Sequence, residues 1–195
     1  TISLVIRSGN WSHACFSDSL FQTVSILTTT GYGTADYELW AFFAQFLILI
    51  LMFVGSMGGS TGGGMKIVRV MLILKYAALE TRRMLHSKAI IPIRIGKRYI
   101  SGDVIRNTLG FFLFYVFIFV FTSFFLTTLN IDLKSSMGVA ASALGNIGPA
   151  LGEFGPTDNY ALLPGAGKWL LTFCMLLGRL EIFTVVVLFS RTFRR

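Results

Sequence analysis

Two long stretches without a charged side chain constrain the fold of this 195-residue chain more than any other feature. The first runs from Leu39 to Met65 and holds 27 residues, and the second runs from Asn107 to Ile131 and holds 25 residues. About 20 apolar residues in a helix suffice to cross a lipid bilayer. A third stretch, Trp169 to Ser190, is long enough but contains Arg179 and Glu181. The sequence therefore predicts an all-α membrane protein with several spans.

The balance of charge predicts how these spans are oriented. Only 13% of the residues are charged, about half of what soluble domains carry. Ten of the 17 Lys and Arg residues lie between Lys66 and Arg106, and three more end the chain. Because basic loops stay on the cytoplasmic side of a membrane, both stretches are predicted to be cytosolic. A basic loop between two spans needs no nucleic acid to explain it, so we expect no nucleic-acid partner.

A short motif at 28–34, Thr-Thr-Thr-Gly-Tyr-Gly-Thr, comes between a predicted helix and the first uncharged stretch. Backbone carbonyls in such a string can replace the water shell of a cation, and glycine permits the left-handed backbone that turns them toward one axis. The helix, over Ser12 to Leu27, has Phe16, Leu20 and Val24 on one face. A glycine turn in an all-β protein is the alternative, and the uncharged surroundings argue against it.

The same arrangement occurs a second time. Lys134 to Leu144 is another short helix candidate, and it runs into a glycine-rich turn at 145–152 before the last span, at about Gly165 to Ser190. Setting Gly148 against Gly31 aligns the two turns, and such a repeat strengthens the interpretation of each copy. The ion path is predicted to be lined by carbonyls of Thr29, Thr30, Gly31, Asn146, Ile147 and Gly148, which are the expected K⁺ ligands, with Tyr32 completing the first filter.

The first uncharged stretch is expected to break near its cytoplasmic end. Six of the ten residues at 55–64 are glycine, which costs a helix about 5–6 kcal/mol relative to alanine. Irregular backbone inside a membrane survives only when it is buried in protein or lines a watery cavity. We therefore expect a gate beneath the filter, formed by Gly55, Ser56, Gly58, Gly59, Ser60, Thr61, Gly62, Gly63, Gly64 and Arg179. Small-residue helix packing is the alternative, whereas a phosphate loop is disfavoured because Lys66 follows Met65.

Arg179 is expected at the depth of that gate. An arginine near the middle of a span costs about 2.5 kcal/mol or more, so it should face a cavity or a partner. Aligning the ends of the two spans sets Gly178 and Arg179 against Gly55 and Ser56. A structural tie between packed helices is the alternative role for this arginine.

Together, the segments 28–34, 55–66, 145–149 and 178–179 resemble the Trk/Ktr/HKT superfamily of potassium transporters, most closely its bacterial TrkH-type membrane subunits. The resemblance implies repeated helix–pore-loop–helix units around a central ion pore, of which this chain is similar to the C-terminal half. Residues 1–104 would hold the pore loop, filter and broken inner helix of the third repeat with a cytosolic linker, and residues 105–195 the complete fourth repeat. We accordingly expect the chain to be truncated upstream of Thr1.

The resemblance also implies a function and partners. It predicts a potassium-translocating pore subunit of a Trk-type uptake system, in the bacterial inner membrane, with K⁺ as its ion and no organic cofactor. It further implies a homodimer, a cytosolic nucleotide-binding regulatory ring of the TrkA kind, contact with membrane lipid, and the N-terminal half of the same protein. Two alternatives stay open, a structural membrane module with glycine-mediated helix packing and a less selective monovalent cation channel. Symport with H⁺ or Na⁺ stays open too, whereas no cluster of catalytic residues favours an enzyme.

Overall fold

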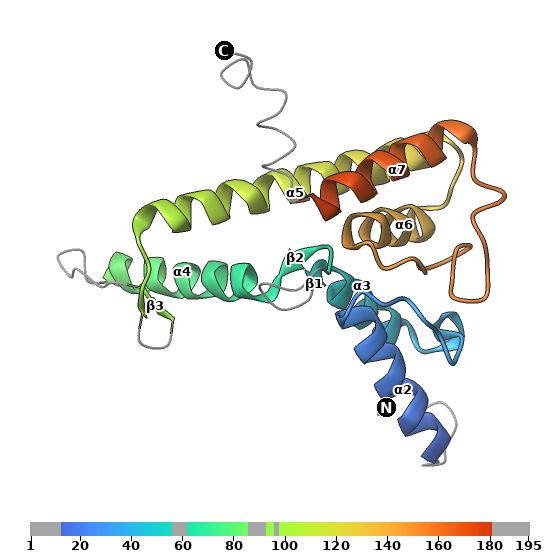
Figure 1. The fold of residues 1–195 in the computed structure, drawn as a ribbon, viewed down its shortest axis with the longest axis horizontal. Coiled ribbons are helices and arrows are strands. Elements are labelled where there is room, and N and C mark those ends of the chain that lie inside the picture. Colours follow the sequence, from blue (N-terminus) through green and yellow to red (C-terminus); the bar gives the residue numbers. More distant parts are fainter. Residues whose placement is uncertain (1–12, 56–61, 86–92, 96–97, 181–195) are drawn as a thin grey trace.

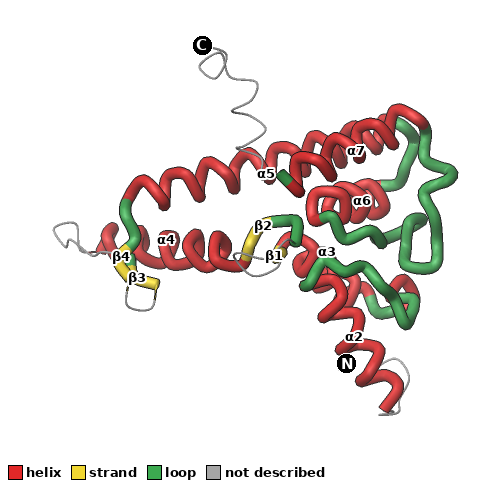
Figure 2. The backbone as a smooth tube through the Cα atoms, viewed as in Figure 1, coloured by secondary structure: helices red, strands yellow, loops and turns green. Residues whose placement is uncertain are grey.

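The computed structural model describes residues 13–55, 62–85, 93–95 and 98–180. Helices make up most of this part of the chain, and the described strands are two residues long (Figure 2). The helical elements are α2 His13–Leu27, the 3₁₀ turn η1 Tyr37–Leu39, α3 Phe42–Phe53, α4 Ile67–Leu85, α5 Gly102–Thr128, α6 Leu133–Gly145 and α7 Gly165–Arg179. The strands are β1 Val54–Gly55, β2 Met65–Lys66, β3 Arg94–Ile95 and β4 Arg98–Tyr99. The predicted all-α class is confirmed.

The short helix α6 lies at the centre of one end of the molecule. It packs against α5, α7 and α3, and Figure 1 shows α5 and α7 running together above it. Its residues from Gly138 to Gly145 are buried, and they are mostly alanine, glycine and serine. Small side chains let neighbouring helices approach closely, which explains how so short a helix can be enclosed. The N-cap is Asp132, whose carboxylate accepts a hydrogen bond from the backbone N–H of Ser135 at 3.2 Å.

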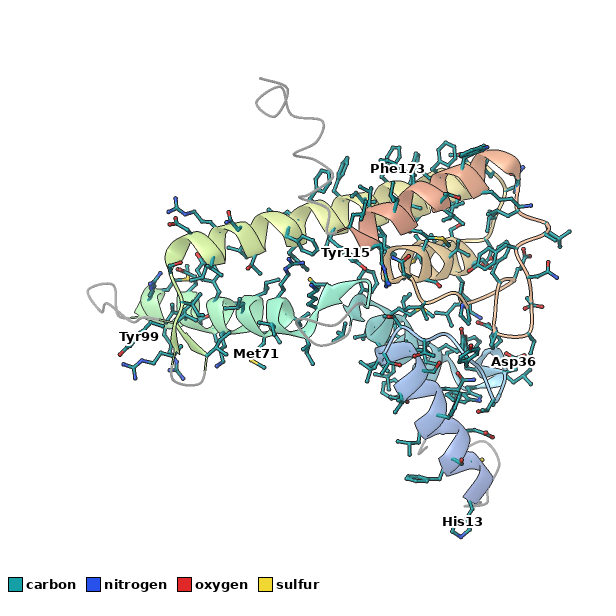
Figure 3. The ribbon with its side chains drawn as sticks, in the orientation of Figure 1. His13, Asp36, Met71, Tyr99, Tyr115 and Phe173 are labelled. Carbon is teal, nitrogen blue, oxygen red and sulfur yellow. The ribbon has the colours of Figure 1, made fainter. Side chains whose placement is uncertain are left out.

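Helix α5 corresponds to the membrane span that the sequence predicted over Asn107 to Ile131. Its 27 residues reach about 40 Å, and it is the one described helix that is long and apolar enough to cross a membrane. Tyr115 points from α5 into the interior (Figure 3), whereas Phe117 and Phe124 of the same helix are exposed. The third predicted span is described only as far as Leu180, one residue beyond the end of α7 at Arg179.

Helix α3 breaks where the glycine-rich segment begins. It ends at Phe53 after 12 residues, about 18 Å, so the stretch Leu39 to Met65 is not one continuous span. Strands β1 and β2 then pair in parallel, with Val54 opposite Met65. The two ends of the glycine-rich segment therefore lie side by side, and α4 begins directly after β2. Ser56, Gly58, Gly59, Ser60 and Thr61 of the predicted gate lie outside the described residues.

The basic part of the chain is built on α4. Helix α4 runs beneath α5, and the β3–β4 hairpin closes its far end (Figure 1). Lys75 Nζ donates to the carbonyl of Arg94 at 3.0 Å, and Ile93 packs with Leu72 and Leu79 in a small second core. The described arginines Arg82 and Arg94 are exposed.

Candidate functional site

The two predicted filter turns both have positive φ at two aligned positions. Thr29 has a φ of 55° and Asn146, which the sequence alignment sets opposite it, has a φ of 53°. Gly31 and Gly148 both have positive φ, at 79° and 111°. A non-glycine residue with positive φ is uncommon, so its occurrence at two aligned positions confirms the predicted alignment of the turns.

The hydrogen bonds that end each preceding helix match as well. The N–H of Thr29 donates to the carbonyl of Ile26 at 3.1 Å, and the N–H of Asn146 donates to that of Ala143 at 3.2 Å. One residue later, the N–H of Thr30 donates to the carbonyl of Ser25 at 2.9 Å, and the N–H of Ile147 to that of Ser142 at 3.1 Å. Each turn is thus the same continuation of a short helix, α2 in one case and α6 in the other.

The two turns also lie against each other. A Cβ atom built on Gly31 would lie 2.0 Å from the carbonyl oxygen of Ile147, a distance that no side chain can occupy. The structure therefore brings the first turn, Thr29 to Gly31, next to the second, Asn146 to Gly148. Gly31 is required here twice, by its backbone conformation and by this close approach.

The carbonyl of Gly148, a predicted K⁺ ligand, is hydrogen-bonded within the protein. Its oxygen accepts a hydrogen bond from Ser142 Oγ at 3.0 Å and another from the hydroxyl of Tyr160 at 2.7 Å. A carbonyl oxygen has two lone pairs, and both are engaged by protein donors. Protein donors therefore engage the carbonyl of Gly148, whereas no such pair of donors is described for the carbonyls of Asn146 and Ile147.

Three side chains at the turns were missed by reasoning from the sequence. Ser25 Oγ donates to the carbonyl of Tyr32 at 2.6 Å, while Ser142 and Tyr160 hold Gly148. Ser25 and Ser142 each stand six residues before the filter glycine, so the repeat carried back into the helices would have revealed them. Burial raises the pKa of Tyr160 to about 12, and its hydroxyl therefore remains a donor at neutral pH.

The loop after the first turn is bonded to the loop after the second. The hydroxyl of Tyr37 donates to the carbonyl of Ala150 at 2.7 Å, and burial raises the pKa of this tyrosine so that it stays protonated. Glu38 Oε1 accepts from the N–H of Gly152 at 2.7 Å, and Glu38 Oε2 pairs with Lys134. These bonds fix the relative position of the two turns.

On the other side of the turns, the described end of the glycine-rich segment meets the end of α7. A Cβ on Gly63 would lie 2.4 Å from the carbonyl oxygen of Gly145, and one on Gly178 would lie 2.1 Å from that of Leu144. Asn146 Nδ2 donates to the carbonyl of Met175 at 3.0 Å, which ties the second turn to α7. Arg179 follows Gly178 directly and is exposed. The last turn of α6 therefore contacts Gly63 of the predicted gate and Gly178, the residue before Arg179.

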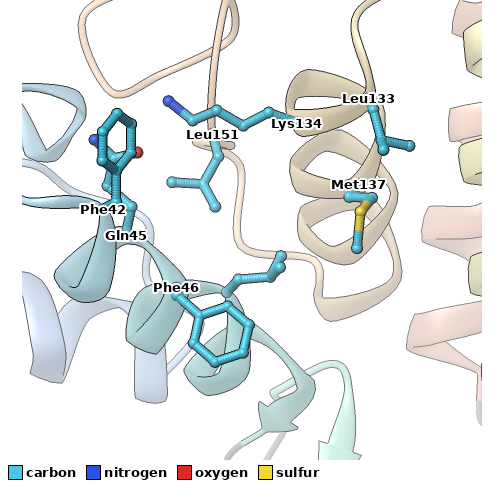
Figure 4. A pocket seen from close by; sticks show the side chains of 8 residues that line it. Phe42, Gln45, Phe46, Leu133, Lys134, Met137 and Leu151 are labelled. Carbon is cyan, nitrogen blue, oxygen red and sulfur yellow. The ribbon is translucent and has the colours of Figure 1, made fainter.

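A pocket of about 350 Å³ lies between α3 and α6, away from this junction (Figure 4). Phe42 and Phe46 of α3 face Leu133 and Met137 of α6 across it, and Lys134 stands at its margin. An apolar lining of this kind offers a dehydrated cation few ligands, so the pocket is distinct from the predicted ion path.

Comparison with known proteins places the chain among cation transporters. The family model described as TrkH, cation transport protein, matches residues 5–194. A Trk system potassium uptake protein TrkH from Halomonas elongata is 42% identical over 195 residues, which are 100% of this chain and 40% of that protein. The TrkH protein of Escherichia coli K12 is 35% identical over 192 residues, which are 95% of this chain and 39% of that protein.

A solved structure is similar along the whole chain. The crystal structure of the potassium transporter TrkH from Vibrio parahaemolyticus matches with a TM-score of 0.88 and 37% sequence identity. The match covers 100% of this chain and 41% of that one. The chain thus spans about two fifths of the length of the proteins that it matches.

Proposed function

Because the chain belongs to the TrkH family of cation transport proteins, we propose that it forms part of the wall of a potassium-conducting pore. The whole protein would be a multi-pass subunit of a Trk-type uptake system in a bacterial inner membrane. The remaining wall of the pore would come from the rest of that protein. The relatives named above are potassium uptake proteins, which favours K⁺ as the ion.

The matched backbone of the two turns is the observation that carries this proposal. The two turns have positive φ at aligned positions and lie in contact with each other. A quasi-symmetric filter requires such an arrangement. Carbonyls held in such a ring can exchange for the hydration shell of a cation. The carbonyls that would do so belong to Thr29, Thr30, Gly31, Asn146 and Ile147.

The contacts of the last α6 turn support a gate beneath this filter. Gly63 and Gly178 both reach that turn, so the glycine-rich segment and Arg179 would lie just beyond the filter. Arg179 would oppose cations by its charge and could donate to carbonyls of the segment.

The basic region offers a place for the regulatory ring that the family resemblance implies. Arg82 and Arg94 are exposed on α4 and the β3–β4 hairpin, where a cytosolic partner could reach them. Pairing into a homodimer and ion coupling by symport are further parts of the proposal that the resemblance supplies.

A less selective monovalent cation channel is the second candidate. It is favoured by the second turn, where Pro149 stands in place of Tyr32 and residues 146–149 depart from the string of the first turn. Turns of unlike sequence would discriminate less well between K⁺ and Na⁺.

Flux through full-length protein in liposomes distinguishes these functions. A potassium uptake subunit should carry K⁺ or Rb⁺ down a gradient and exclude most Na⁺, whereas the second candidate should pass both ions. Empty liposomes provide the background. The protein should be correctly folded and tested with its regulatory partner present. If it then carries neither ion, both functions are contradicted.

Shortening the glycine-rich segment should raise the flux. Strands β1 and β2 are neighbours, so deleting residues 58–61 leaves both ends of the segment in place. An obstruction would be removed while the filter is untouched, and the K⁺/Na⁺ permeability ratio should therefore change little. A lower flux in assembled protein would mean that the segment is structural rather than a gate.

Two single cysteines should report opposite sides of the membrane. Arg82 lies on basic α4, whereas Leu162 is 91% exposed in the loop between α6 and α7. In full-length protein from which every native cysteine, Cys15 and Cys174 included, has been removed, we expect a membrane-impermeant maleimide added to intact cells to label Leu162→Cys and not Arg82→Cys. Permeabilised cells should label both. External labelling of Arg82→Cys would overturn the predicted topology.

A further inference from the structure

We propose that Ser25 and Ser142 are a matched pair of filter-positioning residues, whose hydroxyl groups hold the two turns in their ion-selective shape. The inference rests on the proposed function and adds residues to it. Ser25 Oγ donates to the carbonyl of Tyr32 at 2.6 Å in the first turn. Ser142 Oγ donates to the carbonyl of Gly148 at 3.0 Å in the second turn and accepts from the N–H of the same residue at 3.1 Å.

The direction of its bond sets Ser25 apart from the neighbouring hydroxyl groups of α2, while Ser142 on α6, like Ser135, bonds forward to a later loop. Serine and threonine inside a helix commonly bond back to the carbonyl four residues earlier. Ser19 and Thr23 of α2 do so, donating to Cys15 and Ser19. Ser25 reaches forward by seven residues instead, and Ser142 by six. Their hydroxyl groups are therefore used by the turns and not by the helices.

The position and burial of the pair also match. Each serine lies six residues before the filter glycine, Gly31 or Gly148, and each accepts at its own carbonyl the N–H of the aligned residue Thr30 or Ile147. The exposed fraction of Ser25 is 5% and that of Ser142 is 1%. A buried hydroxyl without a partner is costly, so each side chain is constrained to keep its bond to the turn.

The bonds differ in what they restrain. Ser142 is hydrogen-bonded to both the carbonyl and the N–H of Gly148. The φ of Gly148 is 111°, a value that residues with side chains rarely adopt. Tyr160 adds a second donor to that carbonyl, and its ring stacks on Phe154 with centroids 5.2 Å apart. Because Gly148 is held by its neighbours, the carbonyl of Ile147 before it is fixed in direction as well.

A filter selects between ions only while its carbonyls keep their positions. If a turn loses its hydroxyl bond, its carbonyls can move inward and accommodate the smaller Na⁺ at lower cost. A net hydrogen bond of ordinary strength corresponds to about a fivefold change in an equilibrium. We therefore expect a change in selectivity of that size rather than a loss of conduction.

The test is the K⁺/Na⁺ permeability ratio of full-length protein in liposomes. Ser25→Ala and Ser142→Ala should each lower the ratio about fivefold, with K⁺ flux retained. Ser25→Thr, which keeps a hydroxyl, should restore the ratio. Ser19→Ala and Ser136→Ala are the matched controls, since both serines are buried at aligned positions six residues earlier and do not bond to the turns. Neither control should change the ratio.

A second variant covers the case in which Ser142→Ala fails to assemble. Tyr160→Phe keeps the ring that stacks on Phe154 and removes one donor to Gly148, so a smaller fall in the ratio is expected. If the wild-type protein is selective and the variants of Ser25, Ser142 and Tyr160 keep the same K⁺/Na⁺ permeability ratio, this inference alone is overturned. An equal effect of the control serines would overturn it too. Wild-type protein without any preference for K⁺ would overturn the proposed function and this inference together.

Discussion

Full-length protein that carries Gly31→Ser is expected to lose most of its preference for K⁺ over Na⁺. Gly31 has a φ of 79°, and a left-handed backbone costs a side-chain-bearing residue about 1–2 kcal/mol. The new Cβ would also lie 2.0 Å from the carbonyl oxygen of Ile147, so the second turn must move as well. Since about 1.4 kcal/mol corresponds to a factor of ten, we expect the K⁺/Na⁺ permeability ratio to fall by about tenfold or more.

Two further substitutions separate the causes of this effect. At Gly148 a Cβ would meet nothing within 4 Å, so Gly148→Ser strains only the backbone, with its φ of 111°, and should lower the ratio less than Gly31→Ser does. Gly102→Ser is the control, because Gly102 has neither a close neighbour nor a positive φ. Unchanged ratios for both filter variants would refute the assignment of these turns to the ion path.

Replacing Arg179 by alanine is expected to raise the K⁺ flux by about tenfold. Two unit charges 4 Å apart repel by about 4 kcal/mol at an effective dielectric constant of 20, an upper limit because water and nearby carbonyls would screen the charge. Lys168→Ala is the matched control, since it removes a positive charge from the other end of α7. The measurement is initial K⁺ flux into liposomes at equal protein content.

Arg179→Lys distinguishes two explanations of that rise. Lysine keeps the charge of arginine but lacks its planar array of donors. If repulsion sets the barrier, the lysine variant should conduct like wild type, and if donor bonds hold the gate closed, it should conduct like Arg179→Ala. Loss of flux in a normally assembled Arg179→Ala protein would show instead that the arginine is a structural tie.

Local patterns predicted the elements of the site well. The helix predicted over Lys134 to Leu144 is α6, Leu133–Gly145, and the break at Gly55 ends the helical path of α3. These features depend on glycine and on runs of apolar residues, whose effect on the backbone is local. The equivalence of Thr29 and Asn146 followed from the same spacing, although the two residues differ in chemistry.

Features that depend on distant contacts could not be predicted. The apolar face of α2 was recognised, yet Phe16 is 54% exposed, while Gln22 on the opposite face is buried and bonded to the carbonyl of Ala35. Helical periodicity identifies a face but not the partner that covers it. The engagement of Gly148 by Tyr160 was missed for the same reason, because no short motif links a tyrosine in a loop to a filter carbonyl.

The pairing of Glu38 with Gly152 has a consequence for the order in which the protein is made. The two residues are 114 positions apart in sequence. At about 5–20 residues per second, a ribosome reaches Gly152 about 6–23 s after Glu38, and the carboxylate lacks this partner throughout that interval. The loop that follows the first turn thus completes its contacts only after the loop that follows the second turn has been synthesised.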